Sequence, residues 1–221
     1  MILITGDTHG EFDDFLNRLY QADIKNGDTV VVCGDFGFVW DDPYHRHFLS
    51  KLMALPYTIA FADGNHEDFD LLETFQVVEW SGGKAHKISE NLYHMMRGHI
   101  FTIEEKSFFV FGGAYSIDKA IRKEGYSWWP QELPDSSDYR TAGETLDLCG
   151  YKADYVITHT LPQYAIHLMG IVPDEHDAEL TGYLEWLYGK LDFKTWFAGH
   201  FHENKLIRGN IQVLYDEVIK L

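Results

Sequence analysis

The sequence predicts an α/β protein in which two sheets stack face to face with helices on the outside. Short apolar runs rich in β-branched and aromatic residues alternate with segments of helical period, which is the pattern of a layered α/β fold. Other short runs follow one another through brief turns, which indicates antiparallel pairing as well. A chain of 221 residues that is 45% hydrophobic can bury a substantial core. We therefore expect one domain spanning residues 1–221.

Five apolar runs each end at a turn rich in Gly, Asp, Asn or His, and we expect them to be buried strands. In chain order these runs are ILITGD (2–7), TVVVCGD (29–35), YTIAFADGN (57–65), YVITHT (155–160) and TWFAGHFH (195–202). Apolar positions recur at helical spacing between them, and Pro43 suits a first helical turn. The expected helices are EFDDFLNRLYQAD (11–23), PYHRHFLSKLMAL (43–55), SDYRTAGETLDLCG (137–150) and AELTGYLEWLYGKL (178–191).

Two further stretches are expected to be antiparallel. Within residues 84–114, the short runs KAHKI, NLYHMM, HIFTI and SFFVFGGA predict a single meander. The C-terminal stretch ENKLIRGNIQVLYDEVIKL repeats the pattern, with Arg-Gly-Asn as a hairpin turn. We expect the two halves of the chain to meet as stacked sheets.

The charge balance excludes some classes of partner. There are 18 basic and 35 acidic residues, and the net charge of −17 repels nucleic-acid backbones and anionic membranes. Cys33 and Cys149 are far apart in sequence and do not suggest a disulfide scaffold. The N-terminal MILITGD does not resemble a signal peptide, and no apolar stretch approaches the roughly 20 residues that span a bilayer. We expect a soluble, cytoplasmic protein that binds neither a nucleic-acid duplex nor a membrane.

Residues of metal-ligand type gather at the carboxyl ends of the predicted strands, where open α/β sheets bind ligands. They are Asp7, His9, Asp35, Asn65, His66, His159, His200 and His202. Imidazoles and carboxylates bind first-row transition metals, and an Asn carbonyl can add an oxygen ligand. Taken singly, each residue is more often a turn former, a helix cap or a satisfied polar side chain. Their occurrence at five strand ends together favours a metal site.

The motifs GDTHG, CGDFG, GNHE, ITHT and GHFH, in this order, resemble the five sequence blocks of the calcineurin-like metallophosphoesterases. The resemblance implies a four-layer α/β/β/α sandwich of two mixed sheets with flanking helices. It also implies two metal ions, bridged by an aspartate and by a hydroxide that attacks the phosphate ester. By position, one ion would be held by Asp7, His9, Asp35 and His202. The other ion would be held by Asp35, Asn65, His159 and His200.

The chemistry of this ligand set agrees with the resemblance. Two divalent ions outweigh the charge of two aspartates, so a shell otherwise made of neutral ligands leaves a cationic site that suits a phosphate ester. Ligands of the His, Asp and Asn types suit Mn, Fe, Zn, Co and Ni comparably, and we expect two ions of Mn, Fe or Zn. His66 resembles the family histidine that donates a proton to, or hydrogen-bonds, the leaving-group oxygen. Glu67 or Asp68 could orient its imidazole, and a role at a helix N-terminus is an equal alternative.

Substrate recognition is predicted from a departure from the family pattern. Protein Ser/Thr phosphatases of this superfamily carry Asp-Arg-Gly shortly after the second block, whereas no basic residue follows Asp35 here before Arg46. The segment 108–138 offers a replacement in Arg122, spaced to pair with Asp118. Its aromatic residues, which could face a flat group of the substrate, are Tyr115, Trp128 and Trp129. The alternative is a surface helix with one ion pair and two tryptophans that fill a core gap.

Two functions of different classes follow. The first is a di-metal phosphoesterase for a phosphomonoester or phosphodiester, in which a small molecule or nucleotide is favoured over a phosphoprotein. The alternative is a metal-stabilised protein-interaction module with little or no catalysis, whose acidic surface docks basic partners. A nuclease is a weaker third option, because no duplex-binding surface is evident.

Overall fold

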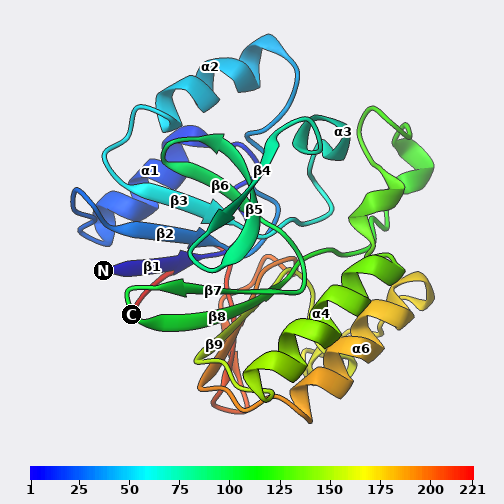
Figure 1. Ribbon diagram of the computed structural model, residues 1–221. Coiled ribbons are helices and arrows are strands. Elements are labelled where there is room, and N and C mark those ends of the chain that lie inside the picture. The colour runs from blue at the N-terminus through cyan, green and yellow to red at the C-terminus, as the bar shows by residue number, and fades with distance from the viewer.

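The computed structural model describes all residues, 1–221, and consists of four layers (Figure 1). Two sheets stack face to face, with α1 and α2 outside the first sheet and α4 and α6 outside the second. The first sheet has seven strands in the order β13-β1-β2-β3-β6-β5-β4, and the second has six in the order β11-β12-β10-β9-β8-β7. Both sheets are mixed, so the expected α/β/β/α sandwich is confirmed.

The first sheet contains the N-terminal strands. Its parallel strands are β1 (Ile2–Thr5), β2 (Thr29–Val32), β3 (Thr58–Phe61) and β6 (Leu92–Met95). Its antiparallel strands are the edge strands β4 (Gln76–Trp80) and β13 (Val218–Lys220) and, between β4 and β6, β5 (Gly83–Ser89). The helices of this half are α1 (Phe12–Gln21), α2 (Pro43–Leu52) and the single turn α3 (Phe69–Leu72).

The second sheet is built from the rest of the chain. Its parallel strands are β8 (Lys106–Phe111), β9 (Tyr155–Thr158), β10 (Thr195–Ala198) and β12 (Ile211–Val213). The antiparallel edges are β7 (His99–Ile103) and β11 (Lys205–Ile207). Its helices are α4 (Ser136–Cys149), α5 (Gln163–Leu168) and α6 (Ala178–Tyr188), with 3₁₀ turns at Lys119–Ile121, Pro130–Glu132 and Glu175–Asp177.

The prediction of one meander in residues 84–114 is wrong. β5 and β6 pair with each other in the first sheet, whereas β7 and β8 pair in the second, so the chain changes sheets between Met95 and His99. The C-terminal stretch divides in the same way, because β11 and β12 form the expected hairpin while β13 joins β1 in the other sheet. Turn residues mark where a strand ends, but they carry no information about the sheet in which the next strand will pair.

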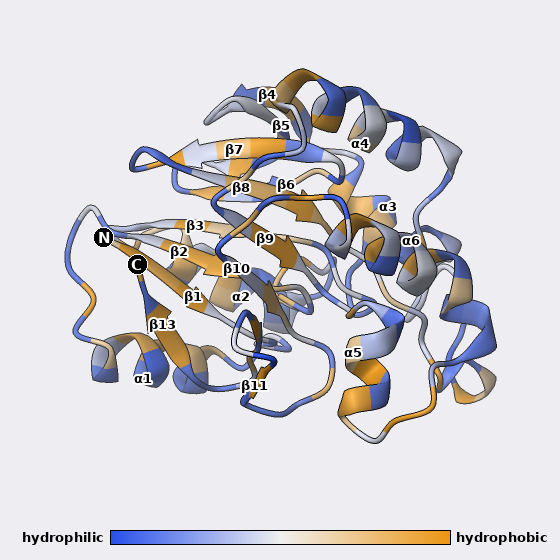
Figure 2. Ribbon diagram, turned by 90° about the horizontal axis from the view of Figure 1, so that it is seen from below, coloured by the Kyte–Doolittle hydropathy of each residue, from blue (hydrophilic) through white to orange (hydrophobic).

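The core lies in three apolar layers. One layer fills the space between the sheets, and the other two lie between a sheet and its helices. Alternation along β1 shows the arrangement, because Ile2 and Ile4 face the other sheet while Leu3 packs among the residues of α1. Figure 2 shows the strands as mainly hydrophobic and the helices as two-sided, as expected for sheets buried on both faces. None of the helices has the length and apolar character that crossing a membrane requires.

Candidate metal centre

Side chains of metal-ligand type from both sheets meet at the carboxyl ends of five strands. Asp7, Asp35 and Asn65 follow β1, β2 and β3, while His159 and His200 follow β9 and β10. Three groups have ligand atoms within 4.8 Å of one another: Asp7, His9 and His202; His9, Asp35 and His66; and Asp7, Asp35 and His159. The site therefore lies where the two sheets face each other, and neither sheet could form it alone.

Asp35 occupies the middle of the cluster. Its Oδ1 lies 3.2 Å from His159 Nε2, and its Oδ2 lies 3.9 Å from His9 Nδ1. On the His9 side, His202 Nε2 approaches Asp7 Oδ2 to 3.2 Å. On the His159 side, Nε2 lies 3.2 Å from Asn65 Oδ1. Asp35 thus has one carboxylate oxygen toward each of two groups of ligand-type atoms.

His200 and His66 complete the cluster. The backbone N–H of His200 donates to Asp7 Oδ1 at 2.9 Å, and its ring meets the His159 ring edge-on with centroids 4.9 Å apart. The backbone N–H of His66 donates to Asp35 Oδ1 at 2.8 Å, and its ring centroid is 5.1 Å from that of His9. All eight residues singled out at the strand ends are therefore brought together.

The electrostatics of the cluster fit a cation. Burial alone would raise the pKa of Asp35, but the charge of His159 and the hydrogen bond from it hold that pKa well below its ordinary value. Burial lowers the pKa of His159, yet Asp35 and Asp7 raise it to about 10. Burial, reinforced by the charge of His159, lowers the pKa of His200 to about 4. Positive charge therefore stabilises the buried carboxylates, and a metal ion bound here would supply it in place of the His159 proton.

Four residues of the cluster have a left-handed backbone. The φ angles are 47° at His9, 47° at Asp35, 71° at His200 and 51° at His202. A side chain other than glycine in this region costs about 1–3 kcal/mol, and such residues concentrate at functional sites. The strain is a feature of this site that the sequence did not reveal.

Two glycines let the backbone approach the carboxylates closely. A Cβ added at Gly64 would lie 2.1 Å from Asp35 Oδ1, and one at Gly199 would lie 2.1 Å from Asp7 Oδ1. The backbone of Gly64 is not left-handed, so conformational freedom does not account for a glycine there. Close approach explains this glycine instead.

The sequence family of the chain is established by comparison. A sequence model described as calcineurin-like phosphoesterase matches residues 1–204 of the 221. The chain belongs to this family. The resemblance carried by the five motifs is therefore confirmed, and the family gives metal-dependent hydrolysis of phosphoesters as the general activity. A search of curated proteins found no match.

In this calcineurin-like phosphoesterase, neither Glu67 nor Asp68 hydrogen-bonds the His66 imidazole, so of the two alternatives the orienting role is not supported. The buried Glu67 carboxylate accepts hydrogen bonds from the N–H groups of Phe36 at 2.7 Å and Gly37 at 3.3 Å. It therefore holds the loop that follows Asp35, and burial together with the Asp35 charge raises its pKa well above the usual value. Asp68 accepts from the N–H of Leu71 at the start of α3, which is the alternative role at a helix N-terminus.

Arg18 supports the other side of the phosphoesterase site, and sequence analysis missed it. Its side chain is only 8% exposed, and Nη1 donates to the carbonyl oxygens of Asp7 at 2.9 Å and Tyr215 at 2.6 Å. The Tyr215 ring stacks on His202 with centroids 4.8 Å apart. The sequence held a signal for this role. Arg18 is next to Leu19 on the apolar side of α1, which predicts a buried position, and it is four residues from Asp14, with which it pairs.

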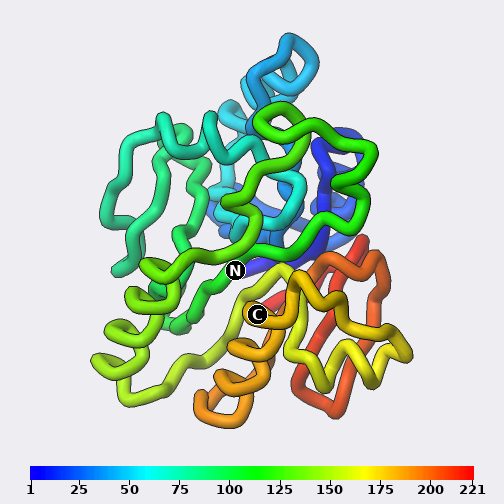
Figure 3. The backbone as a smooth tube through the Cα atoms, turned by 90° about the vertical axis from the view of Figure 1, so that its right-hand side faces the viewer, coloured from blue at the N-terminus to red at the C-terminus, as the bar shows by residue number.

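The segment after β8 contacts two residues of the site. Asn65 Nδ2 donates to Ser116 Oγ at 3.2 Å, which leaves Asn65 Oδ1 directed to the cluster, and Ser116 Oγ donates to the buried Glu132 at 2.8 Å. Arg122 Nη1 donates to Ser116 Oγ at 2.7 Å, and Arg122 Nη2 lies 3.4 Å from His66 Nδ1. Figure 3 shows this green segment folded against the blue and cyan N-terminal half.

The four residues predicted to contact substrate do not share one environment. Arg122 pairs with Asp118 at 3.3 Å as expected, around a 3₁₀ turn rather than a surface helix. Lys119 Nζ lies over the rings of Tyr115 and Trp128, 4.1 Å and 4.4 Å from their centroids, so each ring already has a cation on one face.

Trp129 does not lie open to the site. It is 4% exposed and packs on Trp40 with ring centroids 5.5 Å apart. The structure therefore favours the packing alternative for Trp129.

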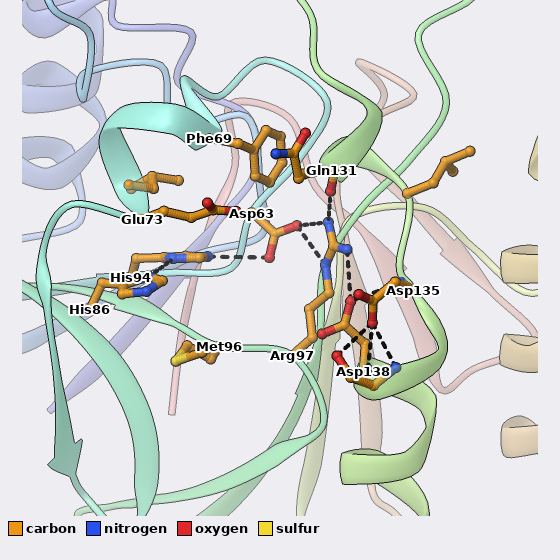
Figure 4. Close-up of a pocket in the computed structure, with 13 residues that line it drawn as sticks. Asp63, Phe69, Glu73, His86, His94, Met96, Arg97, Gln131, Asp135 and Asp138 are labelled. Carbon is orange, nitrogen blue, oxygen red and sulfur yellow. Dashed lines mark hydrogen bonds and ion pairs between the residues drawn. The ribbon is translucent and has the colours of Figure 1, made fainter. Parts of the chain in front are cut away.

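A buried ion-pair network supports the turn before Asn65 (Figure 4). Arg97 donates to Asp63 through Nε at 2.9 Å and also reaches Asp138 at 3.2 Å. His94 Nε2 lies 3.2 Å from the other oxygen of Asp63, and His86 Nδ1 lies 3.0 Å from His94 Nδ1. Asp63 precedes Gly64, so this network fixes the main chain from which Asn65 and His66 project.

Proposed function

We propose that this phosphoesterase uses two metal ions to hydrolyse a phosphomonoester or phosphodiester of a small molecule or nucleotide. The position of Asp35 carries the proposal, because its two carboxylate oxygens face two separate groups of ligand-type atoms. Mn, Fe or Zn suits this set of donors. A phosphoprotein substrate is less favoured, because the chain is strongly acidic and no arginine follows Asp35 closely.

The ligand residues divide into two sets around Asp35. One ion would be held by Asp7, His9, Asp35 and His202, and the other by Asp35, Asn65, His159 and His200. When bound, the ions supply activation of the attacking water and stabilise charge on the phosphoryl oxygens. Ser116 holds the Asn65 amide by accepting from its Nδ2, so the oxygen faces the ion.

His66 is proposed to donate a proton, or a hydrogen bond, to the leaving-group oxygen. Because Arg122 has no acceptor atom, its contact with His66 Nδ1 fits the neutral tautomer with the proton on Nε2, which donates a hydrogen bond to that oxygen; transfer of the proton itself would require the imidazolium form. Arg122 would therefore present the protonated nitrogen to the substrate, in addition to gripping a non-bridging phosphate oxygen.

A turnover assay tests the proposal against the interaction module. The purified protein is stripped of metal, reloaded with Mn²⁺, Fe²⁺ or Zn²⁺, and supplied with chromogenic phosphomonoesters and phosphodiesters. We expect hydrolysis that depends on added metal and that is abolished by a chelator. Folded, metal-loaded protein without activity on any ester would instead support the metal-stabilised interaction module.

His66→Ala is expected to reduce kcat/KM by about 10²–10⁴-fold for alkyl phosphates, the usual contribution of general acid catalysis. Nitrophenyl esters should lose much less, because a good leaving group needs little protonation. Steady-state kinetics on both substrates measure the difference, with the exposed His47→Ala as a matched control. Equal losses on the two substrates would contradict proton donation and indicate phosphate positioning.

Arg122→Ala is expected to lower kcat/KM by about ten-fold or more, the scale of a lost charge-assisted hydrogen bond, with unchanged metal content. The double variant with His66→Ala separates its two roles. If Arg122 acts mainly through His66, adding Arg122→Ala to His66→Ala costs little more. Unchanged kinetics of Arg122→Ala on every active substrate would leave Arg122 as a surface ion pair.

A further inference from the structure

A cavity of about 340 Å³ opens beside the candidate metal centre. His200 forms part of its wall, so the cavity is continuous with the proposed catalytic site. Tyr115 and Ile117 line it from the segment after β8, and Ile171 and Val172 line it from the loop after α5. Ile117 is 81% exposed and Val172 is 84% exposed, so apolar surface remains uncovered at the mouth of the cavity.

Two buried polar atoms in the wall of this cavity lack partners. Asp177 and Thr160 both line it, and they are only 6% and 1% exposed. Asp177 Oδ1 and Thr160 Oγ1 make no hydrogen bond within the protein. Such orphaned atoms are rare in folded proteins and call for an explanation. A small rotation of the Asp177 side chain would bring its unpaired oxygen to a hydrogen-bond donor of a ligand in the cavity, and the Thr160 hydroxyl can either donate or accept.

The charge of the cavity restricts the ligand further. Asp174 and Asp177 are the charged residues of its wall, and neither lysine nor arginine lines it. Burial raises the pKa of Asp177 to about 6, so its carboxylate is charged above that pH. A second phosphate or carboxylate group would be repelled here, whereas a hydroxyl or an amine would be favoured.

We propose that this cavity binds the organic part of the phosphate ester, and that this part is an apolar group bearing a hydroxyl or amine that donates to Asp177. The proposal rests on the proposed function of the adjoining metal centre. On hydrolysis, the water oxygen bonds to phosphorus, the bond from phosphorus to the ester oxygen breaks, and that oxygen takes up a proton. The organic group then leaves as an alcohol, so the cavity should also bind the alcohol product.

Binding of alcohols tests the cavity without requiring turnover. Zn²⁺-loaded protein is titrated, above the pKa of Asp177, with 3-hydroxybenzyl alcohol or 3-methoxybenzyl alcohol, and amide NMR signals are followed. The hydroxyl compound should bind at least about ten-fold more tightly than the methoxy compound, because a methoxy group cannot donate a hydrogen bond. Signals of Tyr115, Ile171 and Phe201 should shift. Equal affinity of the two alcohols, or shifts confined to other parts of the chain, would overturn the proposal.

Three variants locate the effect. Asp177→Ala should remove the preference for the hydroxyl compound; the change breaks no capping hydrogen bond to α6, although it removes the hydrogen bond that the carboxylate accepts from the Tyr115 backbone. Thr160→Val keeps the side-chain shape and should reduce the preference for the hydroxyl compound. Ile171→Trp should weaken the binding of both alcohols, because the larger side chain would fill the mouth of the cavity. Asp147→Asn makes a similar change of charge on the exposed face of α4 and should change nothing. A preference retained in both Asp177→Ala and Thr160→Val would contradict the assignment.

Kinetics separate a failure of the cavity from a failure of the proposed function. The wild-type protein should hydrolyse 3-hydroxybenzyl phosphate with a higher kcat/KM than 3-methoxybenzyl phosphate, and Asp177→Ala should lower that ratio by about ten-fold. Hydrolysis of both esters without preference would refute the proposed role of the cavity but would support the phosphoesterase activity. Absence of hydrolysis of any ester, with the preference among alcohols intact, would refute the phosphoesterase alone.

Discussion

Asp35→Asn is expected to lower kcat/KM by more than about 100-fold, which exceeds the usual effect of losing a group that merely supports a metal ligand. The reason is that Asp35 lies between both groups of ligand-type atoms, so the change would weaken the attraction for both proposed ions and loosen the spacing between them. The metal content of the purified variant should also fall. Elemental analysis and kinetics at saturating metal measure the two effects.

Two comparisons make the Asp35 result specific. Asp7→Asn and His159→Ala alter residues that belong to one proposed ion each, and both should be less damaging at saturating metal. The exposed Asp147→Asn controls for the change in charge. If either Asp7→Asn or His159→Ala proves clearly more harmful than Asp35→Asn, the assignment of Asp35 as the bridge is wrong.

Arg97→Ala is expected to lower the free energy of unfolding by about 3–5 kcal/mol, because it leaves the Asp63 carboxylate buried without its cation. Asp63 is 1% exposed and Arg97 is 8% exposed, so the pair is largely shielded from water. For a chain of this size the melting temperature should fall by roughly 6–20 °C. Thermal and urea unfolding measure the change.

Arg46→Ala is the matched control for Arg97. Arg46 also pairs with an aspartate, Asp41, but both side chains are 63% exposed. Ion pairs of this kind contribute little to stability, so the melting temperature of Arg46→Ala should stay close to that of the wild type. Similar destabilisation by the two variants would show that the Asp63 network is no more important than a surface pair.

Most of the candidate site was predicted from the sequence because its residues lie within short motifs. Each ligand-type residue comes directly after a buried apolar run, and strand ends in α/β sheets collect ligands. The supporting groups were not predicted in this way. Arg18, Ser116 and Glu132 act through contacts with residues far away in the chain, and a single sequence carries no pattern for such contacts.

By itself, the sequence determined the α/β class, the five strands that bear the site, the four long helices and the types of ligand available. These features depend on local apolar period and turn chemistry, which neighbouring residues express directly. Only the tertiary structure decided that β6 and β7 pair in different sheets, that Glu67 holds the loop after Asp35, and that Asp177 and Thr160 share a cavity with His200. These features depend on pairing, packing and hydrogen bonds between segments far apart in the chain. Such contacts stabilise the protein only once both sheets have formed.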